Sequence, residues 1–299
     1  MIFFLLLSMA FAQVEMAITV DDLPSHGQLA NGTTRLELTE KMLKIFKKHQ
    51  VPEVYGFINA ERVFRKPELK SVLEAWVAAG YPLGNHVYSH PDLNKNSIED
   101  FQTEILQNEP ILKELSGAYN WKMFRYPYLH EGETLEKRNA IRKFLFANDY
   151  QIAQVTIDFE DWAWNDPYAR CKNSDNSKAI KRLRKSFHEG ARWSLTHAQK
   201  IAEGLYQRPI KHILLLHVGA FTTDQLDELL SYYKQQGVRF IPLSEALKDP
   251  IYAHDPKQAD VRAAEFTYQV LRERGLTADQ FDPRPKWIFP NKELQSICQ

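Results

Sequence analysis

The sequence predicts an α/β fold, best satisfied by a barrel of about seven parallel strands, with an open doubly wound sheet as the alternative. Short apolar segments alternate with segments of helical periodicity between residues 17 and 243. This alternation is typical of parallel strands joined by right-handed crossovers. The apolar segments are also too hydrophobic for a sheet with one face in water. Finally, reactive polar residues follow several strands, as they do at the active-site edge of parallel α/β folds.

The expected elements follow one another without an internal linker. Strands are predicted at Ala17–Asp22, Val54–Ile58, Tyr81–His86, Lys122–Tyr128, Gln151–Asp158, His212–Val218 and Val238–Leu243. Helices are predicted at Arg35–His49, Pro67–Ala79, Ser97–Leu115, Thr134–Asn148, Lys178–Tyr206 with an interruption near Gly190, Thr223–Gln236 and Asp260–Arg274. The aromatic and polar segment Phe159–Ser177 is expected to be a loop.

The composition is that of an ordinary globular protein. The chain has 299 residues, 44% of them hydrophobic, and 38 basic residues balance 38 acidic ones. Because the formal net charge is zero, nothing in the overall charge favours a nucleic acid or an anionic membrane as a partner. We expect a barrel domain at residues 13–249 and a C-terminal extension at residues 250–299 that packs on it.

The N-terminal residues 1–12 are predicted to be a signal peptide. They are apolar and end in a small-x-small pattern, MIFFLLLSMAFA. They are too few for a membrane span, which needs about 20 residues. The expected basic region is missing, and a buried N-terminal strand is the alternative. Export would place the protein in the periplasm, at the cell wall or outside the cell.

The chain has two cysteines, Cys171 and Cys298. In an exported protein they could form one disulfide, and two free thiols are the alternative. The sequence has no Cys-x-x-Cys motif, so histidines and carboxylates would have to hold any metal ion.

The reactive residues lie where predicted strands end. Two acids, Asp21 and Asp22, end the first strand, and two adjacent carboxylates are costly unless a cation or a proton offsets their repulsion. His86 and His90 are four residues apart, a spacing that lets both imidazoles face one metal ion. With a carboxylate they would form a two-histidine, one-carboxylate site with open positions for water and a substrate oxygen. Such a site suits zinc, and also iron, cobalt or nickel.

Five motifs in order resemble those of the polysaccharide deacetylases, the family 4 carbohydrate esterases. The motifs are TVDD, HVYSH, RYPY, DFEDW and LLLH, which span residues 19–217. The resemblance implies a distorted (β/α)7 barrel. It also implies metal-dependent removal of N- or O-acetyl groups from sugars.

The resemblance assigns two groups of residues around a metal ion. Asp21 resembles the general base that activates the attacking water, and Arg125 resembles the residue that holds the carboxylate of Asp21. Asp22, His86 and His90 resemble the metal ligands. The implied cofactor is one divalent ion, with zinc first and cobalt, nickel or iron as alternatives.

The remaining assignments concern the substrate and the leaving group. His217 resembles the general acid for the leaving amine, and Asp158 resembles the partner that orients it. Tyr128 matches a position whose backbone N–H helps to bind the oxyanion. Trp162 and Leu215 resemble the apolar walls around the acetyl methyl group.

Two positions depart from the family pattern. Leu23 follows the aspartate pair where glycine is common, and we expect it to narrow or reshape the substrate groove. Val87 stands where a hydroxyl residue commonly buttresses the histidine loop, which puts the rigidity of that loop in doubt. The nearby His26 is expected to be a loop hydrogen bonder rather than a ligand.

The sequence thus predicts an exported N-deacetylase acting on an acetylated polysaccharide, foremost N-acetylglucosamine of peptidoglycan. Chitin oligosaccharides, or an O-acetyl esterase activity with the same residues, are the alternatives. A metal-free amide hydrolase is disfavoured by the three ligand residues. From a different class, a non-catalytic carbohydrate-binding barrel is disfavoured by the presence of Asp21 and His217.

Overall fold

A computed structural model describes residues 13–259, 265–283, 285 and 291–299. The predicted signal peptide, residues 1–12, lies outside this part of the chain. Among the described residues, no helix is both long enough and apolar enough to cross a membrane.

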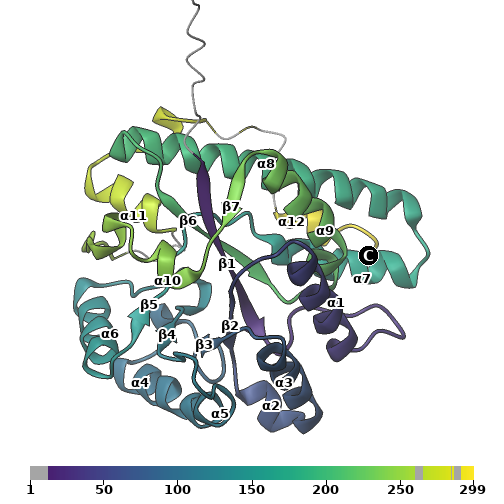
Figure 1. The fold of residues 1–299 in the computed structure, drawn as a ribbon, viewed down its shortest axis with the longest axis horizontal. Coiled ribbons are helices and arrows are strands. Elements are labelled where there is room, and N and C mark those ends of the chain that lie inside the picture. The colour runs from purple at the N-terminus through teal and green to yellow at the C-terminus, as the bar shows by residue number, and fades with distance from the viewer. Residues whose placement is uncertain (1–12, 260–264, 284, 286–290) are drawn as a thin grey trace, which may run out of the picture.

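The centre of the fold is a curled parallel sheet of seven strands in the described residues (Figure 1). The strands are β1 Val14–Leu23, β2 Val54–Ile58, β3 Leu83–Asn85, β4 Met123–Phe124, β5 Gln151–Ile152, β6 Lys211–His217 and β7 Val238–Phe240. Their order is β5-β4-β3-β2-β1-β6, and β7 pairs with the start of β1. After β5 the chain returns to the opposite edge, where Ile157 forms a parallel bridge with Leu214. This arrangement confirms the predicted distorted (β/α) barrel.

Helices surround the sheet (Figure 1). The longer ones are α1 Arg35–Lys48, α3 Lys70–Ala78, α4 Ile98–Gln107, α5 Glu109–Leu115, α6 Leu135–Ala147, α7 Asn165–Asn173, α8 Ser177–Tyr206, α9 Ala220–Gln235 and α11 Phe266–Glu273. The short ones are α2 Glu61–Arg65, α10 Leu243–Ala246 and α12 Asn291–Gln295. Both faces of the sheet are therefore covered, and β1 is buried from Met16 to Leu23.

Helix boundaries follow local side-chain chemistry. Thr34 forms a capping box with Glu37 at the start of α1, and Ser97 accepts a hydrogen bond from the Asp100 N–H at the start of α4. The predicted helix Ser97–Leu115 is split at Asn108, whose side chain bonds the Ile58 carbonyl and the Ala60 N–H. These contacts fix the break close to the end of β2.

Other predicted elements also differ from the structure. The helix α8 continues through Gly190, so the expected interruption is wrong. The strand Lys122–Tyr128 is reduced to Met123–Phe124, because the chain turns at Tyr128 and Leu129, where φ is 58° and 55°. The expected loop after β5 contains a 3-10 helix, η4 Asp161–Trp164, and α7.

The C-terminal end is tied to this same segment. Cys171 of α7 and Cys298 form a disulfide with their Cα atoms 5.3 Å apart. The Arg170 guanidinium donates hydrogen bonds to the carbonyls of Gln295 and Ile297, and the Gln295 side chain donates to the Ala163 carbonyl. The tail therefore packs against η4 and α7.

Candidate active site

A pocket of about 320 Å³ opens at the C-terminal ends of the strands. It is lined by Asp21, Asp22, His26, His86, His90, Tyr126, Tyr128, Leu129, His130, Asp158, Glu160, Trp162, Leu215 and His217. The structure thus brings together all the predicted site residues except Arg125, which lies buried beneath the pocket wall beside Asp21. Residues from five widely separated segments meet there because the C-terminal ends of parallel strands all lie at the same end of the barrel.

The predicted metal ligands form one cluster. Suitable ligand atoms of Asp22, His86 and His90 all lie within 4.8 Å of one another. Oδ1 of Asp22 is 3.5 Å from Nε2 of His86 and 3.3 Å from Nε2 of His90. Nδ1 of His86 is 2.8 Å from the Arg125 carbonyl, so that nitrogen carries the proton and Nε2 is the free ligand atom.

The electrostatics of the cluster suit a divalent cation. Burial lowers the pKa of His86 and His90, which keeps both imidazoles neutral. Burial alone would raise the pKa of Asp22, but the interactions with His90 and Arg62 outweigh it and lower that pKa. Oδ1 of Asp22 is buried without a hydrogen-bond partner among the described residues. An anionic oxygen with no donor beside two neutral imidazoles is the donor set that a metal ion completes.

Asp21 has a different environment from its neighbour. Its Oδ2 atom lies 3.6 Å from Nη1 of Arg125, and its Oδ1 atom is buried without a partner in the described structure. Arg125 is held by hydrogen bonds from Nε to the Ala153 carbonyl and from Nη2 to Oγ1 of Thr19. Burial raises the pKa of Asp21 to about 7 against the lowering effect of Arg125. Asp21 can therefore exchange a proton near neutral pH, as a general base must.

His217 is oriented by Asp161, which corrects the prediction that Asp158 does so. Nδ1 of His217 lies 2.7 Å from Oδ1 of Asp161, and the His217 N–H donates to Oδ2 of Asp161. The Thr222 hydroxyl also donates to Oδ2. Burial alone would lower the pKa of His217, but the Asp161 carboxylate outweighs it and raises that pKa to about 9. His217 therefore holds a proton that it can donate.

Asp158 lines the pocket without contacting His217 through a hydrogen bond. Its carboxylate accepts a hydrogen bond from the Glu160 N–H, and burial raises its pKa to about 6. The chain then turns at Glu160, where φ is 59°, and η4 begins. This left-handed turn brings Asp161, three residues after Asp158, under the imidazole of His217.

Part of the pocket lining is apolar or aromatic. Leu215 is buried at the floor, and Trp162 belongs to η4. The Tyr128 side chain is half exposed, and its ring centroid lies 4.5 Å from that of His90. An acetyl methyl group could pack on the first two residues and a sugar ring on the third.

Sequence reasoning missed the role of Asp161 beside His217 and the pocket residue His130. Asp161 belongs to the DFEDW motif, so its position as a further carboxylate in that motif was the sign in the sequence that it could orient His217. His130 forms a 2.7 Å contact with Asp92, and the two residues are far apart in the sequence. His26, which the sequence predicts to be a loop hydrogen bonder, has its Nδ1 atom 3.3 Å from the Asn165 side-chain amide nitrogen. Its Nε2 atom lies 3.7 Å from Asp22, and burial lowers its pKa to about 4.

The two departures from the family pattern have local structural answers. Leu23 is fully buried and contacts Gly56 of β2, where a Cβ would lie 2.1 Å from Cδ1 of Leu23. The expectation that Leu23 reshapes the groove is therefore wrong, since its side chain faces the core. Val87 is also buried, and its N–H donates to the Asn85 side chain while its carbonyl accepts from Asn59. Two amides thus anchor the histidine loop.

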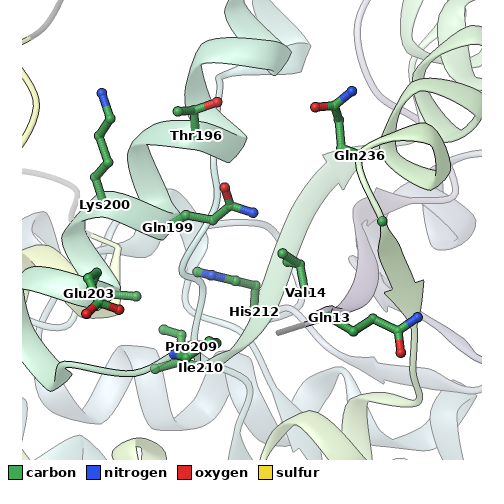
Figure 2. A pocket seen from close by; sticks show the side chains of 12 residues that line it. Gln13, Val14, Thr196, Gln199, Lys200, Glu203, Pro209, Ile210, His212 and Gln236 are labelled. Carbon is green, nitrogen blue, oxygen red and sulfur yellow. The ribbon is translucent and has the colours of Figure 1, made fainter. Parts of the chain in front are cut away.

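A second pocket, of about 720 Å³, lies at the other end of β1 (Figure 2). It is bordered by α8 and by the N-terminal ends of β1 and β6, and His212 points into it (Figure 2). None of the predicted site residues lines it.

Comparison with known proteins agrees with the motifs. A family model for polysaccharide deacetylase matches residues 10–146. A peptidoglycan-N-acetylglucosamine deacetylase from Bacillus cereus is 32% identical over 152 residues, which cover 51% of this chain and 48% of that protein. A chitin deacetylase from Arthroderma benhamiae is 23% identical over 79% of this chain and 52% of its own length. The chain thus spans about half the length of these two relatives.

Solved structures share the fold. A pseudoenzyme of carbohydrate esterase family 4 from Bacillus anthracis has a TM-score of 0.54 at 18% identity, covering 79% of this chain and 66% of that chain. A peptidoglycan N-acetylglucosamine deacetylase bound to an N-oxidanyl-benzamide has a TM-score of 0.51 at 26% identity, covering 79% and 89% respectively. Motifs, family model, relatives and fold agree, and together they support this chain as a member of the polysaccharide deacetylase family, carbohydrate esterase family 4.

Proposed function

We propose that this protein is a metal-dependent hydrolase that removes N-acetyl groups from a glycan and releases acetate. One observation carries the proposal: a ligand cluster, a base and an acid line the same pocket. The cluster is Asp22, His86 and His90. The base is Asp21 beside Arg125, and the acid is His217 beside Asp161.

The ligand cluster would hold one divalent ion, for which zinc is our first candidate. Two nitrogen ligands and one oxygen ligand suit zinc and also cobalt, nickel or iron. When bound, such an ion supplies Lewis-acid activation of water and of the acetyl carbonyl.

The other residues supply the proton transfers. Asp21 takes a proton from the attacking water, and Arg125 keeps its carboxylate in place. His217 gives its proton to the nitrogen of the leaving amine, and Asp161 stabilises the imidazolium until then. The Tyr128 backbone N–H would help to stabilise the oxyanion, while Trp162 and Leu215 would enclose the acetyl methyl group.

The proposed substrate is N-acetylglucosamine in peptidoglycan. The support is the curated relative of that name in Bacillus cereus, together with two proteins of the same description in Listeria monocytogenes strains at 24% identity. The chitin deacetylase relative supports chitin oligosaccharides as the alternative, and an O-acetyl ester would fit the same residues. The partner is thus an acetylated polysaccharide, and the zero net charge gives no reason to expect a nucleic acid.

A non-catalytic role is the competing hypothesis, because some structural neighbours are pseudoenzymes. Acetate release from N-acetylglucosamine oligomers by the zinc-loaded protein separates the two. We expect Asp21→Asn and His217→Ala each to lower turnover by about 10²–10⁴-fold. Asp227→Asn, on the surface, is the control that should keep full turnover. Equal turnover in all four proteins would contradict the proposed roles.

We also propose that residues 1–12 direct export to the periplasm or cell wall. The support is their apolar pattern and the wall polymer that the relatives are named for. Cell fractionation with mass spectrometry of the intact protein tests this. Shortened protein outside the cytosol is expected, and full-length protein confined to the cytosol would contradict it.

A further inference from the structure

A short segment after β2 lies between the two parts of the chain that carry the ligand cluster. Asn59 and Ala60 connect β2 to α2, and Arg62 belongs to the first turn of α2. Neither Asn59 nor Arg62 belongs to the motifs on which the family resemblance rests. Asp22 lies at the C-terminal end of β1, and His86 and His90 lie on the loop after β3.

Arg62 contacts both the backbone and the side chain of Asp22. Its Nη1 donates a 3.0 Å hydrogen bond to the Asp22 carbonyl, and its Nη2 lies 3.8 Å from Oδ2 of Asp22. Asp22 adopts φ 69°, a left-handed conformation that costs energy for a residue other than glycine. The Ser25 N–H donates to the same carbonyl. Arg62 therefore helps to hold a strained residue in place.

The same contacts orient the carboxylate of Asp22. Arg62 and His26 lie on the side of Oδ2, at 3.8 and 3.7 Å. The other oxygen, Oδ1, is left facing His86 and His90. The Arg62 guanidinium therefore helps to fix the orientation of the carboxylate, with one oxygen directed toward Arg62 and the other toward the histidines.

The fully buried Asn59 contacts the loop after β3 through its side chain and the end of β1 through its backbone. Its Nδ2 donates to the carbonyls of His86 and Val87 at 2.7 and 2.9 Å. Its backbone N–H donates to the Leu23 carbonyl, immediately after Asp22. Val87, whose carbonyl accepts one of these hydrogen bonds, has φ 67°. It adopts a left-handed backbone conformation, as Asp22 does. Both donor hydrogens of the amide are used, one for each carbonyl.

We propose that Asn59 and Arg62 are positioning residues that set the affinity of the Asp22–His86–His90 cluster for its metal ion. This inference rests on the metal site of the proposed function. Groups outside the ligand set fix the orientation of metal ligands in proteins, and their loss typically weakens metal binding by about 10–100-fold. Here Asn59 and Arg62 fix the end of β1 and the loop after β3 relative to each other, which the ligands themselves cannot do.

The test is the dissociation constant for zinc, measured by competition with a chromophoric chelator. Arg62→Gln should bind zinc about 10–100-fold more weakly, because it loses the charge and the paired donors. Arg62→Lys should recover part of the affinity, because it keeps the charge. Asn59→Asp should also bind more weakly, because it puts an oxygen where Nδ2 meets two carbonyls.

Arg65→Gln is the matched control. Arg65 lies one residue beyond Phe64 on the same short helix, and its guanidinium pairs with Glu61 rather than with a ligand loop. It should bind zinc as the wild type does. Circular dichroism establishes that each variant is folded, and Arg62, being partly exposed, gives a test even if the buried Asn59 variant does not fold.

The outcomes separate this inference from the proposed function. Wild-type zinc affinity in folded Arg62→Gln would overturn the inference and leave the deacetylase proposal intact. A wild-type protein that binds no zinc and releases no acetate with any of the candidate ions would overturn both. Equally weakened zinc binding in Arg62→Gln and Arg65→Gln would also overturn the inference. The effect would then follow from the loss of any positive charge on α2 and not from the contacts of Arg62 with Asp22.

Discussion

Two adjacent aspartates with opposite electrostatic environments are the chemical centre of this protein. Burial raises the pKa of Asp21 to about 7, while nearby positive groups lower that of Asp22 despite its burial. The difference arises because Asp22 turns into the left-handed region and faces the histidines, whereas Asp21 remains beside Arg125. Asp21 can thus accept a proton near neutral pH while Asp22 stays ionised, as the proposed ligand role of Asp22 requires.

Asp161, and not Asp158, should control the protonation of His217. Replacing Asp161 by Asn removes the carboxylate that raises the His217 pKa to about 9. Burial then dominates, so the alkaline fall in kcat/KM should move to lower pH. Asp158→Asn, the matched control, should keep the wild-type alkaline limb. A pH profile in which Asp158→Asn shifts that limb and Asp161→Asn does not would contradict this assignment.

The same pair should make stability depend on pH. Since the pKa of His217 is raised in the folded protein, its protonated form stabilises the fold. This contribution should be complete below about pH 6.5 and disappear as the pH rises to about 9. Urea unfolding across that window should show a smaller pH dependence in Asp161→Asn than in the wild type. Parallel curves for the two proteins would refute the coupling.

At the scale of elements, the C-terminal tail secures the segment that carries Asp161. The disulfide joins α7 to residue 298, and Leu294 of α12 is buried against the main core. Because η4 lies directly before α7, tail contacts reach the residues that orient His217. The sequence suggested a possible pairing of the two cysteines, and the structure forms it.

Reduction of the disulfide should therefore destabilise the protein. A cross-link that closes a long loop typically contributes about 2–4 kcal/mol to the free energy of unfolding. Guanidinium denaturation with and without a phosphine reductant measures the loss. The double variant Cys171→Ala and Cys298→Ala should be insensitive to the reductant. Identical curves for the reduced and oxidised wild type would contradict a structural role.

The elements also show how far the sequence determines the site. Strand ends, histidine spacing and an acidic pair could be read directly, because buried strands and their polar termini have distinct patterns. The partner of His217 could not be predicted from the sequence, because the position of Asp161 depends on the left-handed turn at Glu160. The contacts of Arg62 and Asn59 with the ligand cluster could not be predicted either, since only the folded sheet brings these residues together.

For the whole molecule, the parallel sheet places every proposed catalytic group at the C-terminal ends of its strands. Removal of metal by a chelator should abolish acetate release, because Asp21 and His217 alone provide no ligand for the acetyl oxygen. Added zinc should restore the activity, and Asp22→Ala should show no such recovery. Undiminished turnover in metal-free protein would contradict the metal dependence proposed for this chain.

The function that we propose for this barrel is removal of acetyl groups from the N-acetylglucosamine of peptidoglycan. Mass spectrometry of peptidoglycan fragments before and after treatment with the zinc-loaded protein tests it most directly. We predict fragments that have lost one acetyl group per modified glucosamine, and no such loss with Asp21→Asn. Unchanged fragment masses with the wild-type protein, at metal saturation, would contradict the claim.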